Sequence, residues 1–99
     1  MTTPLKLTSG TGASGDTVIA AAGEIDMSNA AAFRDALSQA AAAGTAFTVD
    51  LTAVEYLDSA GLTALLPYAS RIKIIAPAIL APVLSVTGLD PVTTVVPAP

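Results

Sequence analysis

Residues 47–66 read FTVDLTAVEYLDSAGLTALL, and this stretch decides the fold class of the chain. At its start, apolar and polar residues alternate over 47–51, a spacing of two that predicts a β-strand with one apolar face. After Ser59 the apolar residues change to the helical spacing of three and four; they are Leu62, Leu65, Leu66 and Ala69. Pro67 removes a backbone donor inside this stripe, so we expect the helix to be short or kinked.

The residues before this stretch predict a hairpin. Leu5 and Leu7 alternate with polar residues, as in a short edge strand, and the Ser, Thr, Gly and Ala content of residues 9–15 indicates a flexible loop. Residues 18–22 form an apolar run that is followed by Gly23, and they suit a second strand paired with the first.

A helix is predicted between the hairpin and the strand at 47–51. Ser28 and Asn29 offer N-cap oxygens at its start, and Gly44 offers a stop at its end. Its apolar face consists of Phe33, Ala36, Leu37 and Ala40.

The residues after Pro67 predict two more strands and another helix. The strands cover residues 72–75 and 92–96, and the helix covers 79–87, beginning near Pro77 and ending at Gly88. The order β-β-α-β-α-β-α-β predicts an α/β domain with a mixed, mostly parallel sheet of about five strands and helices packed against it. We expect a single domain over residues 1–99.

Composition argues against an enzyme. The chain has no histidine and no cysteine, so it lacks the commonest general base, thiolate metal ligands and disulfides. We expect no cofactor and no metal site. A Mg²⁺ or Ca²⁺ site built from carboxylates stays a weak alternative, because the spacing of the acids fits no known loop motif.

Charge and hydropathy narrow the possible partners. The net charge is -4 and the four basic residues are dispersed, which argues against nucleic-acid binding. No signal peptide is visible, and the longest apolar run, residues 74–84, is far shorter than the about 20 residues of a membrane helix. We therefore expect a cytoplasmic protein without membrane insertion.

Carboxylates follow two strands that should be neighbours. Glu24 and Asp26 follow the second strand, and Glu55 and Asp58 follow the third; with Asp50 they are five of the eight acids. Ligands and partners of such sheets meet the loops at the carboxyl ends of the strands. We therefore expect the two loops side by side, as an acidic patch around a serine hydroxyl.

That hydroxyl belongs to Ser59, where a helix begins. We expect it to be exposed, with the free N–H groups of Ala60, Gly61 and Leu62 facing an added phosphate, and Gly61 to remove side-chain bulk there. A simpler interpretation is that Asp58 and Ser59 are only helix-capping residues and that the acids are solvated. A serine hydrolase is rejected, because the first Gly of the nucleophile elbow and a base are missing.

Four segments in this order resemble the STAS domain family, of which bacterial anti-sigma factor antagonists are typical. The segments are Gly23-Glu24-Ile25-Asp26, residues 49–54, residues 56–62 and Thr87-Gly88-Leu89-Asp90. The similarity covers about residues 16–97. The Asp-Ser-x-Gly element after a strand is its most specific part.

The resemblance implies a function as well as a fold. It implies that Ser59 is phosphorylated by an anti-sigma factor that is itself a serine kinase. The unphosphorylated protein binds this anti-sigma factor and thereby frees the sigma factor. Phosphorylation ends this binding, and a serine phosphatase restores it. Asp26 and Asp58 match the docking surface for the kinase, and we expect Glu24, Ala60 and Gly61 to belong to it.

The chain departs from the family pattern in two regions. The segment between Leu66 and Ile72 is several residues shorter, and the family's final helix has no counterpart before Pro99. The surface that this helix would cover is then open, which favours self-association.

Two other functions stay open. One is an accessory STAS subunit of a membrane ABC transporter, bound to its ATPase and not necessarily phosphorylated. The other is nucleotide binding. Residues 9–15 argue against it, because their glycines have the wrong spacing for a P-loop and the segment lacks the P-loop Lys.

Overall fold

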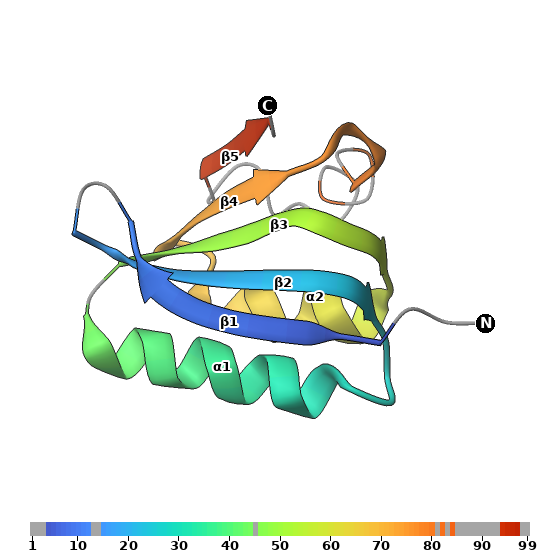
Figure 1. Ribbon diagram of the computed structural model, residues 1–99, viewed down its shortest axis with the longest axis horizontal. Coiled ribbons are helices and arrows are strands. Elements are labelled where there is room, and N and C mark those ends of the chain that lie inside the picture. The colour runs from blue at the N-terminus through green and yellow to red at the C-terminus, as the bar shows by residue number, and fades with distance from the viewer. Residues whose placement is uncertain are drawn as a thin grey trace.

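The computed structural model describes residues 4–12, 15–44, 46–80, 82, 84 and 94–97. Within these residues, five strands and the helices α1 and α2 follow one another (Figure 1). Their bounds are β1 (Lys6–Thr11), β2 (Thr17–Ile25), α1 (Ala30–Ala43), β3 (Phe47–Leu57), α2 (Ser59–Leu65), β4 (Ile72–Ala76) and β5 (Thr94–Pro97). Two short 3-10 turns, η1 (Leu66–Tyr68) and η2 (Ala78–Leu80), follow α2 and β4.

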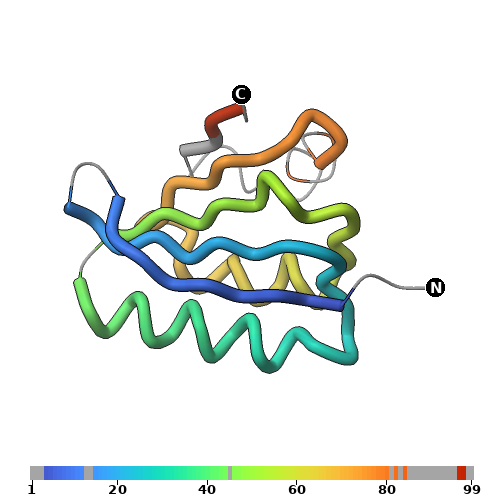
Figure 2. Tube along the Cα trace, viewed as in Figure 1, coloured from blue at the N-terminus to red at the C-terminus, as the bar shows by residue number. Residues whose placement is uncertain are grey.

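The strands form one sheet in the order β1-β2-β3-β4-β5. The pair β1–β2 is antiparallel, and the other three pairs are parallel. This arrangement confirms the predicted mixed sheet. Figure 2 follows the chain from β2 through α1 to β3, the crossover that makes these two strands parallel neighbours.

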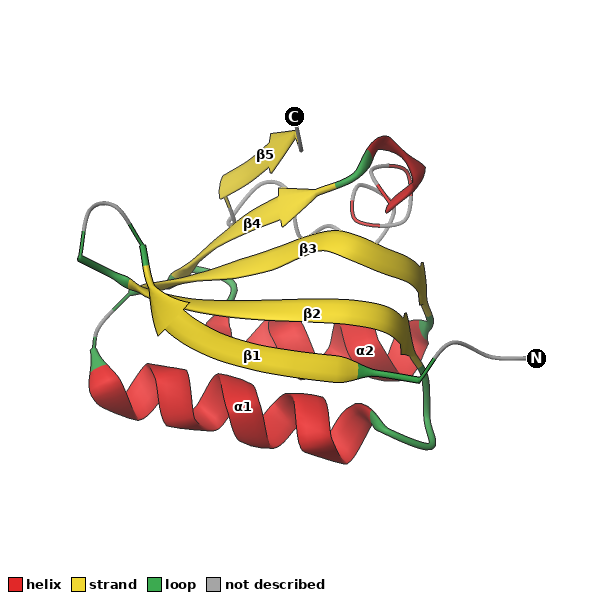
Figure 3. Ribbon diagram, in the orientation of Figure 1, coloured by secondary structure: helices red, strands yellow, loops and turns green. Residues whose placement is uncertain are grey.

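Both α-helices lie on the same face of the sheet, and the core lies between them and the strands (Figure 3). The apolar residues of alternating strand positions and of one helical face are fully buried there. The largest of them are Phe33, Phe47, Ile25, Leu37, Leu51, Leu65, Ile74, Leu84 and Val49.

The strands of the hairpin and β3 are longer than their apolar patterns predicted. Residues 9–11 lie in β1 rather than in a loop, and β2 continues beyond Gly23 to Ile25. The paired register from Lys6↔Ala22 to Thr11↔Thr17 explains the first difference, because ladder hydrogen bonds use the backbone and accept small polar residues. Glu24 is consequently a strand residue, as is Glu55 in β3.

Helix α1 ends differently from the prediction. Neither Ser28 nor Asn29 caps its start, because their side-chain oxygens accept no hydrogen bond from the first turn; both side chains bond within a preceding turn instead. Gly44 does stand at the C-terminus, but its backbone is extended rather than left-handed. The terminal carbonyls of Ala41 and Gly44 accept hydrogen bonds from Arg71 Nη2, at 2.9 and 2.8 Å.

Helix α2 is short, as Pro67 predicted, and continues into η1. Leu66 is half exposed, so its assignment to the buried stripe was wrong, because the change to 3-10 geometry turns it away from the core. Of the helix predicted at 79–87, the structure describes η2 and residues 82 and 84; the rest, with Gly88 and Val92, lies outside the described residues.

Candidate functional site

The strands β2 and β3 end together at one edge of the sheet, so the two acidic loops are neighbours as predicted. Ile25 pairs with Leu57, the last residue of each strand. The backbone N–H of Asp58 also donates to the carbonyl of Ile25 at 3.2 Å. This bond joins the start of the α2 segment directly to the end of β2 (Figure 1).

Asp58 is the N-cap of α2. Its Oδ1 accepts from the N–H of Ala60 at 2.8 Å and from that of Gly61 at 3.2 Å, and its carbonyl accepts from the N–H of Leu62 at 3.1 Å. The expectation that these three N–H groups are free was therefore wrong. The Asp58 carboxylate satisfies those of Ala60 and Gly61, as N-cap preferences allow, and the Asp58 carbonyl satisfies that of Leu62.

Ser59 is the first residue of α2, and its side chain is exposed. Its carbonyl accepts a hydrogen bond from Thr63 Oγ1 at 2.7 Å. Among the described residues, none bonds to the Ser59 hydroxyl. The hydroxyl is thus presented to solvent on a backbone that Asp58 fixes.

Gly61 is buried and does not contribute to the surface. A Cβ at this position would clash with Leu57 Cδ1 and would lie 2.9 Å from Ile25 Cγ2. The missing side chain therefore lets α2 approach the ends of β2 and β3. Gly61 therefore affects the position of Ser59 through the packing of α2 against the sheet, and it does not make room for a phosphate as we expected.

Asp26 lies in a turn that the sequence pattern did not reveal. Its Oδ1 accepts hydrogen bonds from the Ser28 hydroxyl and, at 2.9 Å, from the Ser28 N–H. Asn29 closes the turn: its Oδ1 accepts from the Asp26 N–H at 2.9 Å, and its Nδ2 donates to the Glu24 carbonyl at 2.9 Å. Hydrogen bonds from the Ser28 hydroxyl and the Ser28 N–H, with a lesser contribution from the Asn29 backbone, lower the pKa of Asp26 below its ordinary 3.8, although desolvation acts in the opposite direction.

Four acids, called the acidic patch below, lie within two residues of the paired strand ends Ile25 and Leu57; they are Glu24, Asp26, Glu55 and Asp58. Glu24 pairs with Tyr56 in the β2–β3 register, close to the end of both strands. Asp50 is not part of the patch: it lies seven residues before Leu57, about 23 Å along a strand. Its carboxylate instead accepts from the N–H and hydroxyl of Thr52, where the β2–β3 register shifts.

Two exposed apolar side chains lie near these acids, and the sequence pattern did not identify them as candidate contact residues. Met27, in the Asp26 turn, is 82% exposed, and Tyr56, next to Glu24, is 50% exposed. Methionine and tyrosine are enriched in protein interfaces relative to the rest of the surface. Their position at the strand ends, Met27 just after β2 and Tyr56 one residue before the end of β3, was the available signal in the sequence.

In the described part of the chain, no three acidic side chains gather closely enough to hold a metal ion. No described helix has the length and apolar character to cross a membrane.

Comparisons with known proteins agree with this fold. The family described as "Mlab, STAS domain" matches residues 9–95. No curated protein matches the sequence.

Solved structures are similar over nearly the whole chain. An anti-sigma factor antagonist from Mycobacterium paratuberculosis is 27% identical with a TM-score of 0.83, over 93% of this chain and 85% of that one. The unphosphorylated anti-sigma factor antagonist SpoIIAA is 19% identical with a TM-score of 0.69, over 95% and 89%. Phosphorylated SpoIIAA, a Bacillus cell fate determinant, is 19% identical with a TM-score of 0.64, over 95% and 92%. With the family match extending over most of its residues, the chain belongs to the STAS domain family.

Proposed function

We propose that this chain is an anti-sigma factor antagonist that binds an anti-sigma factor with serine kinase activity and is switched off by phosphorylation of Ser59. The observation that carries the proposal is the exposed Ser59 hydroxyl at the start of α2, beside the acids that end β2 and β3. The antagonist from M. paratuberculosis, 27% identical, supports the general role. A serine phosphatase would restore the active form in the cytoplasm.

The geometry suggests how a phosphate acts here. A phosphoserine adds about -1.5 to -2 charges and three acceptor oxygens. Because Asp58 already occupies the N–H groups of Ala60 and Gly61, the start of the helix offers the phosphate little compensation. The new charge therefore adds to the acidic patch, and a partner that binds these acids loses its fit while the fold stays intact.

The docking surface combines charge with apolar contact. Glu24, Asp26, Asp58, Ser59 and Ala60 supply its polar part, and Met27 supplies an exposed apolar side chain. Its chemistry fits a partner that presents Lys or Arg around an apolar pocket. Gly61 contributes indirectly, through the position of α2.

The proposal is tested with the anti-sigma factors of the source organism. Each is titrated with the wild type, Ser59→Ala and Ser59→Asp in a calorimeter, and each is incubated with ATP for intact-mass analysis. We expect one phosphate on the wild type and none on Ser59→Ala. We expect Ser59→Asp to bind at least about tenfold more weakly, the scale of losing a contact worth about 1.4 kcal/mol.

Ser38→Asp is the matched control, because it places the same charge on an exposed position of α1. It should bind like the wild type. Equal binding by Ser59→Asp, or phosphate on Ser59→Ala, would contradict the proposal. Co-purification with a transporter ATPase and no anti-sigma binding would support the transporter subunit instead.

A further inference from the structure

The outer edge of β1 has no partner among the described residues. β1 stands at the end of the strand order and pairs only with β2. The N–H of Gly12 donates to the carbonyl of Asp16 at 2.7 Å, and these residues continue the β1–β2 register. Hydrogen-bonded pairs alternate in an antiparallel ladder, so Gly10, Thr8 and Lys6 bond to β2.

The alternate residues Leu7, Ser9 and Thr11 therefore direct their backbone N–H and C=O groups outward. Proteins usually protect such an edge with charged side chains such as lysine, with proline or with a bulge. In β1 only Lys6, at its start, is of this kind; the following residues LTSGT have no charge and no proline, and their pairing with β2 has no irregularity. The edge is competent to accept another strand.

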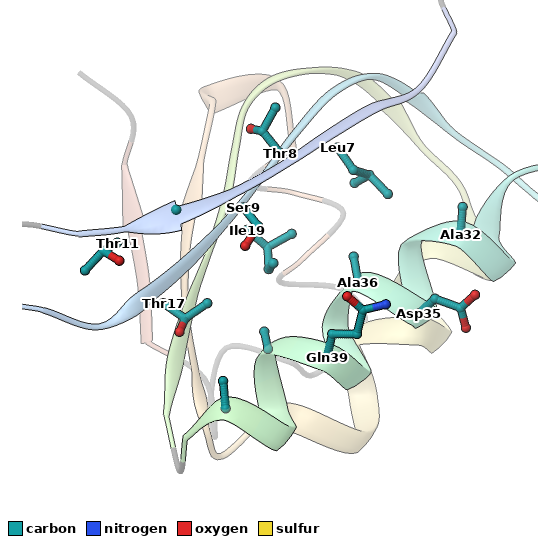
Figure 4. A pocket seen from close by; sticks show the side chains of 13 residues that line it. Leu7, Thr8, Ser9, Thr11, Thr17, Ile19, Ala32, Asp35, Ala36 and Gln39 are labelled. Carbon is teal, nitrogen blue, oxygen red and sulfur yellow. The ribbon is translucent and has the colours of Figure 1, made fainter.

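A groove runs beneath this edge, between β1 and α1 (Figure 4). Its volume is about 670 Å³. Leu7 and Ile19 extend into it from the strands, and Ala36 faces them from α1 (Figure 4). α1 contributes mainly alanines here, with Gln39 as its one long uncharged side chain, so most of the space is left for the side chains of an added strand (Figure 4).

The charges along the groove have one sign. Asp35 is the only ionisable residue among those that line it. Leu7 and Ala32 also line a second hollow of about 370 Å³, so the two hollows adjoin, and the only ionisable residue that lines the second is Asp26. The complementary ligand is therefore basic.

From these observations we infer that β1 and α1 form a docking groove for an extended basic segment of a partner protein, which adds to the sheet beside β1. Alternate residues of the segment face the groove and include small aliphatic side chains and Lys or Arg. Backbone hydrogen bonds to Leu7, Ser9 and Thr11 give affinity, and Asp35 and Asp26 select the charge.

A second copy of this chain fits the groove less well. The only basic residue of β1, Lys6, pairs with Ala22 in the row that lines a hollow on the opposite face of the sheet. An added β1 would thus offer no positive charge to the groove. Its α1 would also bring a second Asp35 to the same surface.

The test uses three synthetic eight-residue peptides with threonine at every second position. The other positions hold only valine in the first peptide, valine and lysine in the second, and valine and glutamate in the third. Backbone amide shifts of the ¹⁵N-labelled full chain report binding. We expect the lysine peptide to bind best and to shift the amides of Leu7, Ser9 and Thr11. Asp26 belongs to both proposed surfaces, but neither the amide shifts of Leu7, Ser9 and Thr11 nor the peptides involve Ser59, so either proposal can fail alone.

Ser9→Pro removes one outward N–H, at an edge position where proline is tolerated, and Ser9→Ala is its matched control. We expect Ser9→Pro to weaken lysine-peptide binding about tenfold and Asp35→Lys about threefold, with Ser9→Ala unchanged. Melting temperatures show that each variant is folded.

Three results would overturn the inference. They are equal binding of the lysine and glutamate peptides, wild-type affinity in Ser9→Pro, and no shift at the β1 edge with any peptide at millimolar concentration. A dimer in sedimentation analysis that Ser9→Pro abolishes would assign the edge to a second copy and also overturn it.

Discussion

Gly61 connects the packing of single residues to the position of Ser59. Replacing it with alanine puts a Cβ against Leu57 and Ile25, at the ends of β3 and β2. Both neighbours are buried and have little room to move. We expect Gly61→Ala to lower the free energy of unfolding by about 1–3 kcal/mol, the usual cost of overpacking. Urea unfolding measures this change.

Gly10→Ala is the control for this substitution. A Cβ at Gly10 meets nothing within 4 Å, and no positive φ stands in its way. We expect its stability to change by less than about 1 kcal/mol, with any gain coming from the less flexible unfolded chain. Equal stability of the two variants would contradict the close approach of α2 to the strand ends.

Asp26 provides a pH-dependent test of its turn. Hydrogen bonds from Ser28 lower the pKa of its carboxyl below 3.8. A lowered pKa in the folded state means that the ionised form stabilises the fold; this contribution is complete above the unfolded pKa and is lost as pH falls through the folded pKa. An NMR titration should therefore show Asp26 ionised below its ordinary range.

Ser28→Ala removes the largest cause of this shift, so the pKa of Asp26 should rise toward 3.8 in that variant. The pKa of Asp26 in Ser38→Ala should stay at its wild-type value, because Ser38 lies on the exposed surface of α1. An unchanged Asp26 pKa in Ser28→Ala would show that the turn does not form as described.

At the scale of elements, the C-terminus of α1 depends on a residue distant in sequence. Arg71 donates to the carbonyls of Ala41 and Gly44, and its positive charge lies near the negative end of the helix dipole. We expect Arg71→Met, which keeps most of the aliphatic stem, to destabilise the protein by about 1–2 kcal/mol. Thermal or urea unfolding would show it.

Arg34→Met is the matched control, because Arg34 is exposed on α1 and has no partner among the described residues. Its stability should change by less than about 0.5 kcal/mol. An equal loss of stability in both variants would show that the loss comes from removing a positive charge and not from the hydrogen bonds to the end of α1.

These elements show what side-chain patterns can predict. The helical spacing of Phe33 and Leu37 and the proline at 67 were enough to place α1 and to shorten α2. The strand ends were not predictable, since the β1–β2 ladder extends through small polar residues by backbone bonds. The cap by Arg71 spans 27 to 30 residues and has no local signal.

At the scale of the whole molecule, the alternation of strands and helices predicted that β2 and β3 are parallel neighbours, and the register confirms it. The acidic loops therefore meet, as the order of elements alone required. The sequence offered Asp58 both as a helix cap and as a neighbour of free N–H groups, and it could not decide between them, because capping and phosphate binding use the same atoms; the structure shows the cap.

The central claim is that the solvent-facing Ser59 hydroxyl is a regulatory switch. The most direct measurement is intact-mass analysis with phosphosite mapping of the protein purified from its native cells, under growth and stress conditions. We expect one phosphate, located on Ser59, whose occupancy changes between conditions. A protein unmodified in every condition, or phosphate only on another residue, would contradict it.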